Sequence, residues 1–316
     1  MGAEVGRRLV QTIPVVFFSV ILVFMLLRLT PGDPALMYAG PDAAPEVIAV
    51  VRERMGLDLP LPAQFFLWLA RAAQGDFGRS FASGIPVADL IRLRFPATLE
   101  LAVSAVLLTI LVAIPVGTLA AVRRGGPFDV IVRGFSVVGL AVPNFWIGIL
   151  LIIGMALFLD WLPPGGYVSA AADPVANLRF LVLPAVTLSI PNLAVLIRFV
   201  RSAMLDVLHS DYVRTARAKG LSERAVQYRH ALKNALIPVL TVLGLQFGRM
   251  LGGAVIVEAV FAWPGMGQLM LQGVGNRDYA VVQGALLVFV LAFVMVSVLI
   301  DIATVVVNPR LRGQAI

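Results

Sequence analysis

Long stretches without a charged side chain recur along this chain. Four are uninterrupted, at residues 9–27, 101–122, 134–159 and 180–197. A fifth run, 235–257, is interrupted only by Arg249, and a sixth covers 279–300. About 20 apolar residues in a helix cross the hydrocarbon core of a bilayer. The pattern therefore predicts an all-α polytopic membrane protein with six transmembrane helices.

The composition agrees with this prediction. Hydrophobic residues make up 59% of the 316 positions, charged residues only 14%, and the mean hydropathy is +0.93. Soluble domains carry about 25% charged residues, so the composition excludes an ordinary soluble protein. Because the sequence has no cysteine, disulfides, thiolate metal sites and a cysteine nucleophile are excluded as well.

The formal net charge of +7 is distributed unevenly over the loops. With the N-terminus placed in the cytoplasm, the segments on that side carry 15 basic and 5 acidic residues, and those on the outer side carry 9 basic and 11 acidic. Lys and Arg accumulate on the cytoplasmic side of membrane proteins, so both termini are predicted to be cytoplasmic. The positive charge then reflects topology in the bilayer, and a role with nucleic acid loses its support.

Residues 30–97 form a predicted external insertion after the first span. The insertion opens with Thr30-Pro31-Gly32-Asp33-Pro34, through which no helix can run. Two apolar-periodic stretches follow, at 46–55 and 63–73. Residues 65–69 of the second stretch are too apolar for a free linker. We expect these residues to pack against other parts of this chain. The alternatives are that they pack on the outer membrane face or on a partner.

The cytoplasmic segment 198–234 contains a short predicted helix. Asp211 suits its N-cap and Gly220 suits the position after its C-cap. A second helix, capped by Ser222, is expected to run into the fifth span. Ala216 and Gly220 are small and four residues apart, which would let another protein approach closely. Either a docking helix or an ordinary positively charged loop fits this spacing.

Two charged residues within the fifth span are functional candidates, because charges inside a membrane are costly. Arg249 and Glu258 are nine residues apart, about 13.5 Å along a continuous helix, too far for direct pairing. Arg249 either faces a pathway or gate, or meets a carbonyl, a water or a partner's acid. Glu258 lies near the outer end, where it would contact the external insertion or a binding protein. We find no catalytic constellation and no helix-spaced histidine pair that would hold a metal.

Several motifs carry a family resemblance. The stretch Asp211–Gly220 with residues 229–238 resembles the permease signature of bacterial ABC importers, and more narrowly the B-type subunit of dipeptide/oligopeptide importers. Matching stretches run from the first span to the last, at residues 29–34, 75–80, 251–258 and 261–267. The general signature has glutamate-alanine-alanine where this chain has Arg214-Thr215-Ala216, as is usual in the peptide subgroup. The family's aspartate-proline-arginine end motif reads Asn308-Pro309-Arg310 here.

The resemblance implies a type I-like ABC importer permease, with residues 1–316 as a single permease domain in the bacterial inner membrane. Its implied partners are a second homologous permease, two ATP-binding subunits, an extracytoplasmic substrate-binding protein and a peptide substrate. The coupling loop would be residues 203–234. The residues implied to contact an ATPase subunit are Asp211, Arg214, Thr215, Ala216 and Gly220.

No cofactor is expected in this chain itself. The sequence has no Gly-Lys dipeptide, so it cannot hold a Walker A loop. ATP and Mg are therefore expected in the partner ATPase subunits, and this subunit is not an enzyme.

Other functions remain open at this point. The same permease motifs serve importers of nickel chelates, glutathione or other small solutes. An ion-coupled secondary transporter would need paired acids at mid-membrane and usually an internal repeat, and the sequence has neither. A membrane enzyme would need catalytic residues that we do not find.

Overall fold

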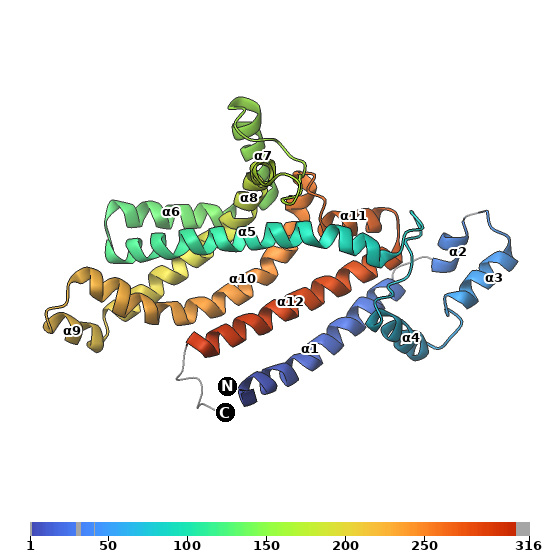
Figure 1. The fold of residues 1–316 in the computed structure, drawn as a ribbon, viewed down its shortest axis with the longest axis horizontal. Coiled ribbons are helices and arrows are strands. Elements are labelled where there is room, and N and C mark those ends of the chain that lie inside the picture. Colours follow the sequence, from blue (N-terminus) through green and yellow to red (C-terminus); the bar gives the residue numbers. More distant parts are fainter. Residues whose placement is uncertain (1, 30–32, 41, 308–316) are drawn as a thin grey trace. The chain divides into compact units, whose positions relative to one another are not determined.

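The computed structural model describes the whole chain except residues 1, 30–32, 41 and 308–316. Parts of two motifs, 30–32 and 308–310, therefore lie outside the described residues. Helices make up the described fold (Figure 1), and the pairing of Arg79 with Pro86 is its single β-bridge. In chain order the helices are α1 (Gly2–Leu29), α2 (Pro34–Ala39), α3 (Pro45–Arg54), α4 (Leu61–Ala73), α5 (Val87–Val122), α6 (Pro127–Ala141), α7 (Asn144–Leu151), η1 (Ile152–Phe158), α8 (Pro174–Leu208), α9 (Asp211–Ala218), η2 (Ala225–Ala231), α10 (Leu232–Val260), α11 (Met266–Gly275) and α12 (Tyr279–Val307).

Four helices in the described part of the chain are long and apolar enough to cross a membrane. They are α5, α8, α10 continued from η2, and the apolar part of α12. α6 together with α7 and η1 is also long and apolar enough, but this pair is sharply bent and forms either a broken fifth span or a re-entrant loop. In α1 the described apolar segment, Thr12–Met25, is shorter than these spans. The all-α membrane fold is thus confirmed, and a full crossing by the first helix stays a prediction.

The expected continuous span at 134–159 is wrong. The chain bends by 108° between α6 and α7. Pro143 begins the second arm and lacks the N–H that a continuing helix needs. The residue before a proline is driven into extended backbone, and Val142 has φ −89° and ψ 127°. Pro184 and Pro191 lie inside α8 without ending it.

α5 begins at Val87, so the last residues of the predicted insertion, 87–97, form the start of the long helix that contains the second span. Within the insertion, the two apolar-periodic stretches form the helices α3 and α4. Asp33 accepts a hydrogen bond from Ala35 N–H at 3.0 Å and caps α2.

The chain divides into two compact units. The first comprises residues 1–9, 99–263 and 295–316, and the second comprises 10–98 and 264–294. In the first unit α8 packs against α6, α7 and α10. Two thirds of the most apolar stretch of α8 is buried, compared with 28% of the corresponding stretch of the η2–α10 helix. Gly117 of α5 lies so close to α8 that a Cβ would stand 2.8 Å from Val200 Cβ.

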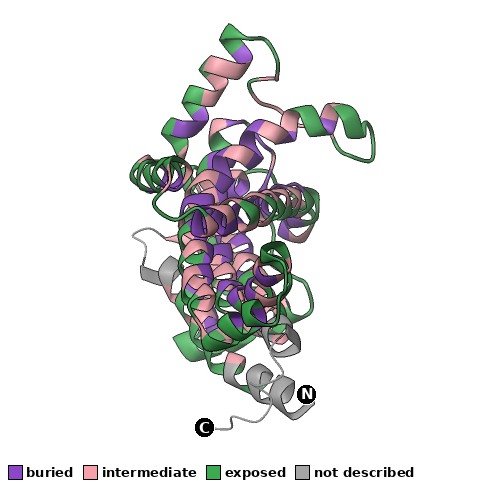
Figure 2. Ribbon diagram, turned by 90° about the vertical axis from the view of Figure 1, so that its left-hand side faces the viewer, coloured by how far each residue is buried: buried purple, intermediate pink, exposed green. Residues whose placement is uncertain are grey.

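Exposed apolar side chains cover the outer sides of these helices, and individual helices carry buried and exposed residues on different sides (Figure 2). Leu111 of α5 and Leu245 of α10 are each 70% exposed. Water would disfavour such surfaces, whereas lipid tails or a partner's apolar face would cover them.

The second unit is built around aromatic packing. Phe65 of α4 is buried against Phe24 of α1, with ring centroids 5.4 Å apart. Trp68 and Leu69 pack on the same cluster. Packing of this segment within the chain is therefore confirmed, although Phe66 is 63% exposed.

Candidate functional site

The short helix α9 begins one residue earlier than the sequence pattern indicated. Ser210, in extended backbone, is the N-cap, and Asp211 is the first helical residue. The prediction that Asp211 caps the helix is therefore wrong. Its carboxylate still lies in the first turn, where the helix dipole favours negative charge. Ser210 Oγ instead donates to Val207 O at 2.5 Å, which ties α9 to the end of α8.

The C-terminus of α9 is closed as predicted. Gly220 has φ +76° and follows the C-cap Lys219. Its N–H donates to Arg217 O at 2.9 Å, and Leu221 N–H donates to Ala216 O at 3.4 Å. This double closure requires left-handed backbone, which glycine adopts without a steric cost.

One side of α9 packs on the chain itself. Val213 is fully buried and forms a cluster with Ala216, Val226 of η2 and Val207 of α8. Ala216 is only 8% exposed. The expectation that Ala216 and Gly220 share one open surface is therefore wrong, because the apolar spacing of residues 213 and 216 turns Ala216 toward η2.

Polar contacts add to this anchoring. Asn234 Nδ2 of α10 donates to the Tyr212 hydroxyl at 2.8 Å. Arg217 Nε donates to Glu223 Oε1 at 2.8 Å, and this hydrogen bond lowers the pKa of the Glu223 carboxyl below its usual range. The pair is exposed, so salt screens it and its contribution is small.

The other side of α9 is open. Asp211, Arg214, Thr215 and Gly220 are exposed. Arg214 Nη2 lies 3.1 Å from Asp211 Oδ1, with both side chains more than four-fifths exposed. Four of the five predicted contact residues thus form a solvent-accessible edge, available to another protein.

The chain continues from α9 into a membrane-length helix. Ser222 Oγ accepts from Ala225 N–H at 3.4 Å, consistent with the expected cap. The helix then runs through the π-helical turn η2 into α10. A displacement of α9 would therefore be passed to two long helices, α8 before it and α10 after it.

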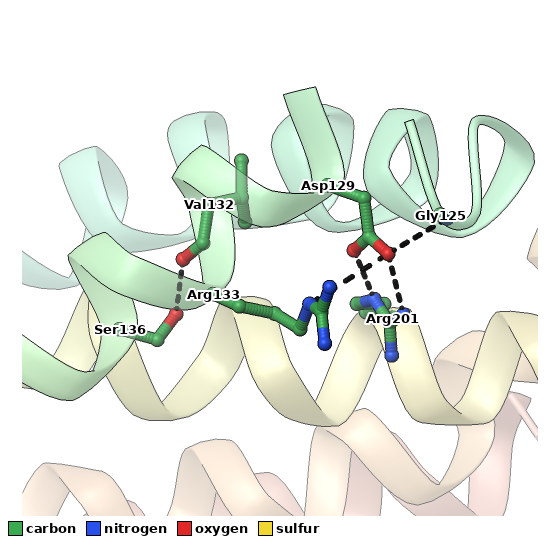
Figure 3. A network of polar contacts seen from close by, with 6 residues as sticks. All are labelled: Gly125, Asp129, Val132, Arg133, Ser136 and Arg201. Carbon is green, nitrogen blue, oxygen red and sulfur yellow. Dashed lines mark hydrogen bonds and ion pairs between the residues drawn. The ribbon is translucent and has the colours of Figure 1, made fainter. Parts of the chain in front are cut away.

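A buried ion pair that the sequence analysis missed braces α8 close to this site (Figure 3). Asp129 of α6 is buried and accepts from Arg201 Nε at 2.6 Å and Arg201 Nη2 at 2.8 Å. Gly125 N–H donates to the same carboxylate at 3.0 Å. The only hint in the sequence was a lone acid in a basic loop, because the partners are 72 residues apart.

The two charged residues of the fifth span lie on the continuous helix α10. Arg249 is exposed, whereas Glu258 is fully buried. Arg249 is thus open to a lumen or a partner. The burial of the Glu258 side chain leaves it out of reach of a binding protein, and its expected contact with the external insertion stays a prediction.

Membrane-length helices joined by a short, exposed, well-anchored helix define a class of polytopic membrane subunit rather than a particular chemistry. The family described as "Binding-protein-dependent transport system inner membrane component" matches residues 113–313, and its N-terminal companion family matches residues 3–102. The chain belongs to this family. It is the membrane-spanning permease subunit of an ABC importer.

Known relatives cover nearly the whole chain. It is 43% identical over 312 residues to a probable peptide ABC transporter permease protein of Sinorhizobium fredii, covering 99% of this chain and 100% of that protein. It is 42% identical over 306 residues to the glutathione transport system permease protein GsiC of Escherichia coli, covering 97% of both. The inward facing MetNI methionine ABC transporter shares the fold, with a TM-score of 0.56, 18% identity and coverage of 69% of this chain and 96% of that chain.

Proposed function

We propose that this permease imports short peptides, forming the translocation pathway together with a second, homologous permease. A substrate-binding protein delivers the peptide from outside, and two ATP-binding subunits drive the cycle. The relatives named as peptide permeases support the substrate class. The large apolar surfaces on the outer sides of α5 and α10 offer area for lipid and for a second subunit.

The N-terminus and C-terminus lie in the cytoplasm in this proposal, and so does α9. The excess of basic residues in the segments on that side supports this orientation. The α3 and α4 helices of the insertion then lie on the outer side. ATP and Mg are bound by the partner ATPase subunits, because this sequence has no Gly-Lys dipeptide for a Walker A loop.

The anchoring of α9 is the observation that carries the proposed coupling. A helix of eight residues is unstable alone in water, yet here its buried side, Val213 and Ala216, and its two closures hold it between α8 and η2. Its exposed edge is then free to sit in a groove of an ATPase subunit. Force applied to that edge moves two membrane-length helices together.

The energy required favours packing over surface charge. Reversing a 1:99 population between outward-open and inward-open states needs about 5.5 kcal/mol of differential stabilisation. An exposed ion pair such as Arg214–Asp211 contributes about 0–1 kcal/mol. A packed docking helix provides a larger and less screened difference between the two states. Arg249, exposed on α10, is our candidate for a residue lining the pathway.

Site-directed crosslinking tests the docking of α9. The chain has no cysteine, so Thr215→Cys introduces a single thiol on the exposed edge, and Val213→Cys introduces one on the buried edge as a matched control. The transporter is assembled with ATPase subunits that each carry one cysteine introduced in the expected docking groove. We expect Thr215→Cys to form a disulfide with that groove cysteine and Val213→Cys to form none. Equal crosslinking at both positions, or none at residue 215, would contradict the docking.

Glutathione is the second candidate substrate, because a relative of 42% identity is named for its transport. Competition for uptake separates the two candidates. Unlabelled dipeptides or tripeptides without a thiol should block uptake of a labelled peptide, whereas inhibition by glutathione alone would favour the second candidate.

A further inference from the structure

The second compact unit contains a cavity of about 410 Å³ that is separate from the α9 site. Its walls come from α3, α4, the turn at residues 76–81 and the start of α12. All of these segments belong to the same compact unit. The volume is in the range of small-molecule sites, about 300–1,000 Å³.

Aromatic side chains form the apolar part of this cavity. Trp68, Phe77, Phe81 and Tyr279 all line it. Trp68 packs on the buried Phe24, with ring centroids 5.8 Å apart. This wall therefore offers a fixed surface to an apolar side chain of a ligand.

A buried carboxylate holds the cavity in shape. Asp278 is 2% exposed and accepts from Ser80 Oγ at 2.6 Å and from Ala82 N–H at 3.2 Å. It also accepts from Val281 N–H at 3.3 Å, which caps α12. One side chain thus joins the 76–82 turn to the start of α12, so the walls are organised before a ligand enters.

The charged side chains that line the cavity carry a formal net charge of +1; they are Arg71, Arg79, Arg277, Asp76 and Asp278. Arg71 and Arg277 line it, and neither side chain has a hydrogen bond or ion pair with the described residues. Asp278 is occupied as above, and Asp76 Oδ1 accepts from Gly78 N–H at 2.9 Å. Paired or single guanidinium groups are the usual partners of a carboxylate.

The backbone of Arg277 has a strained, left-handed conformation. Its φ is +53°, at the left-handed position that follows the C-cap of α11. The residue that follows the C-cap is a glycine in two other helices, Gly75 after α4 and Gly220 after α9. A side chain at such a position is strained where glycine is not, and strained residues cluster at binding sites. The strain at Arg277 thus points to a use for its guanidinium.

Gln64 joins α4 to the turn before it. Its side chain is 8% exposed, and its Nε2 donates to Leu57 O at 3.1 Å and Leu59 O at 2.8 Å. The Gln64 Oε1 and the Tyr279 hydroxyl are fully buried behind the wall, so neither offers a hydrogen bond to a ligand in the cavity.

We propose that this cavity binds a short peptide with a free carboxylate. The carboxylate lies on Arg71 and Arg277, and an apolar side chain packs on the aromatic wall. The carboxylate and the apolar group are inferred from the cavity, whereas the choice of a peptide as the ligand rests on the proposed function. The site lies outside the α9 docking contact and would be a second place where this subunit meets peptide.

Equilibrium binding to the full-length chain tests the proposal. The chain is placed in phosphatidylcholine nanodiscs without binding protein or ATP, and the probes are radiolabelled L-alanyl-L-phenylalanine and its C-terminal amide. We expect the amide to bind about tenfold more weakly than the acid. Arg277→Gly should weaken binding of the acid by about tenfold and leave that of the amide unchanged.

The variants separate binding from folding. Arg277→Gly removes backbone strain, so its thermal stability should equal or exceed that of the native chain. Tyr279→Phe removes a buried hydroxyl behind the wall and keeps the aromatic ring, so it should leave the affinity for both probes unchanged. Arg92→Ala removes a cation at an exposed position of the same unit and should change neither affinity.

Three results would overturn the proposal. These are equal affinity for acid and amide, unchanged affinity in Arg277→Gly, and displacement of the dipeptide by phosphatidylethanolamine, which would make the cavity a lipid site. The proposed coupling is judged separately, because crosslinking at residue 215 does not involve this cavity.

Discussion

Loosening the buried side of α9 should uncouple it from the long helices. Val213 is fully buried and packs in a cluster with Ala216, Val226 and Val207. Val213→Ala removes two methyl groups at about 0.8 kcal/mol each and leaves a small cavity. We expect α9 docking to weaken by about 2 kcal/mol, which raises the population of the undocked helix roughly 30-fold.

Hydrogen exchange measures this effect directly. Amides of α9 that exchange only after undocking should exchange roughly 30-fold faster in Val213→Ala. Thr215→Ala on the exposed edge is the matched control and should not accelerate exchange. In the assembled transporter, Val213→Ala should lower peptide uptake per ATP hydrolysed. Unchanged exchange in Val213→Ala would refute the anchoring argument, and faster exchange with native coupling would refute the role of the anchored helix.

Three further predictions concern the frame of the site. Asp129→Asn leaves the largely buried Arg201 without its counter-charge and should cost about 2 kcal/mol; the midpoint of thermal unfolding in detergent should fall, and Asp89→Asn, at an exposed pair, should leave it unchanged. Gly220→Ala meets no neighbouring atom within 4 Å but is strained at φ +76°, so it should destabilise α9 by about 1 kcal/mol, seen as faster exchange of the α9 amides. The hydrogen bond from Arg217 lowers the pKa of Glu223 in the folded state. The ion pair therefore stabilises α9 at pH values above the ordinary glutamate pKa, and this stabilisation is lost as pH falls through the lowered pKa. The exchange rate of the α9 amides, corrected for the intrinsic rate, should rise over that acidic range in the native chain and not in Glu223→Gln.

Local patterns predicted α9 well except at its N-terminus and in the assignment of its faces. Gly220 was identified because left-handed backbone after a helix strongly favours glycine. The N-cap was placed one residue too late, at Asp211, since Ser210 and Asp211 are both good N-caps and only backbone geometry separates them. Ala216 was assigned to the open side because its small size fits close approach by either another protein or η2.

The sequence by itself located four membrane-length helices, α5, α8, α10 and α12, the two apolar stretches of the insertion and the cap of the second helix after α9. These depend on hydrophobic periodicity and on residues within one or two turns of each other. Only the tertiary structure decided that Asp129 meets Arg201, that Pro143 marks a bend of 108° and that Arg277 lines a cavity with Gln64. Such contacts join residues far apart in the chain, and their energy comes from burial and from charges brought out of water, which no local pattern encodes.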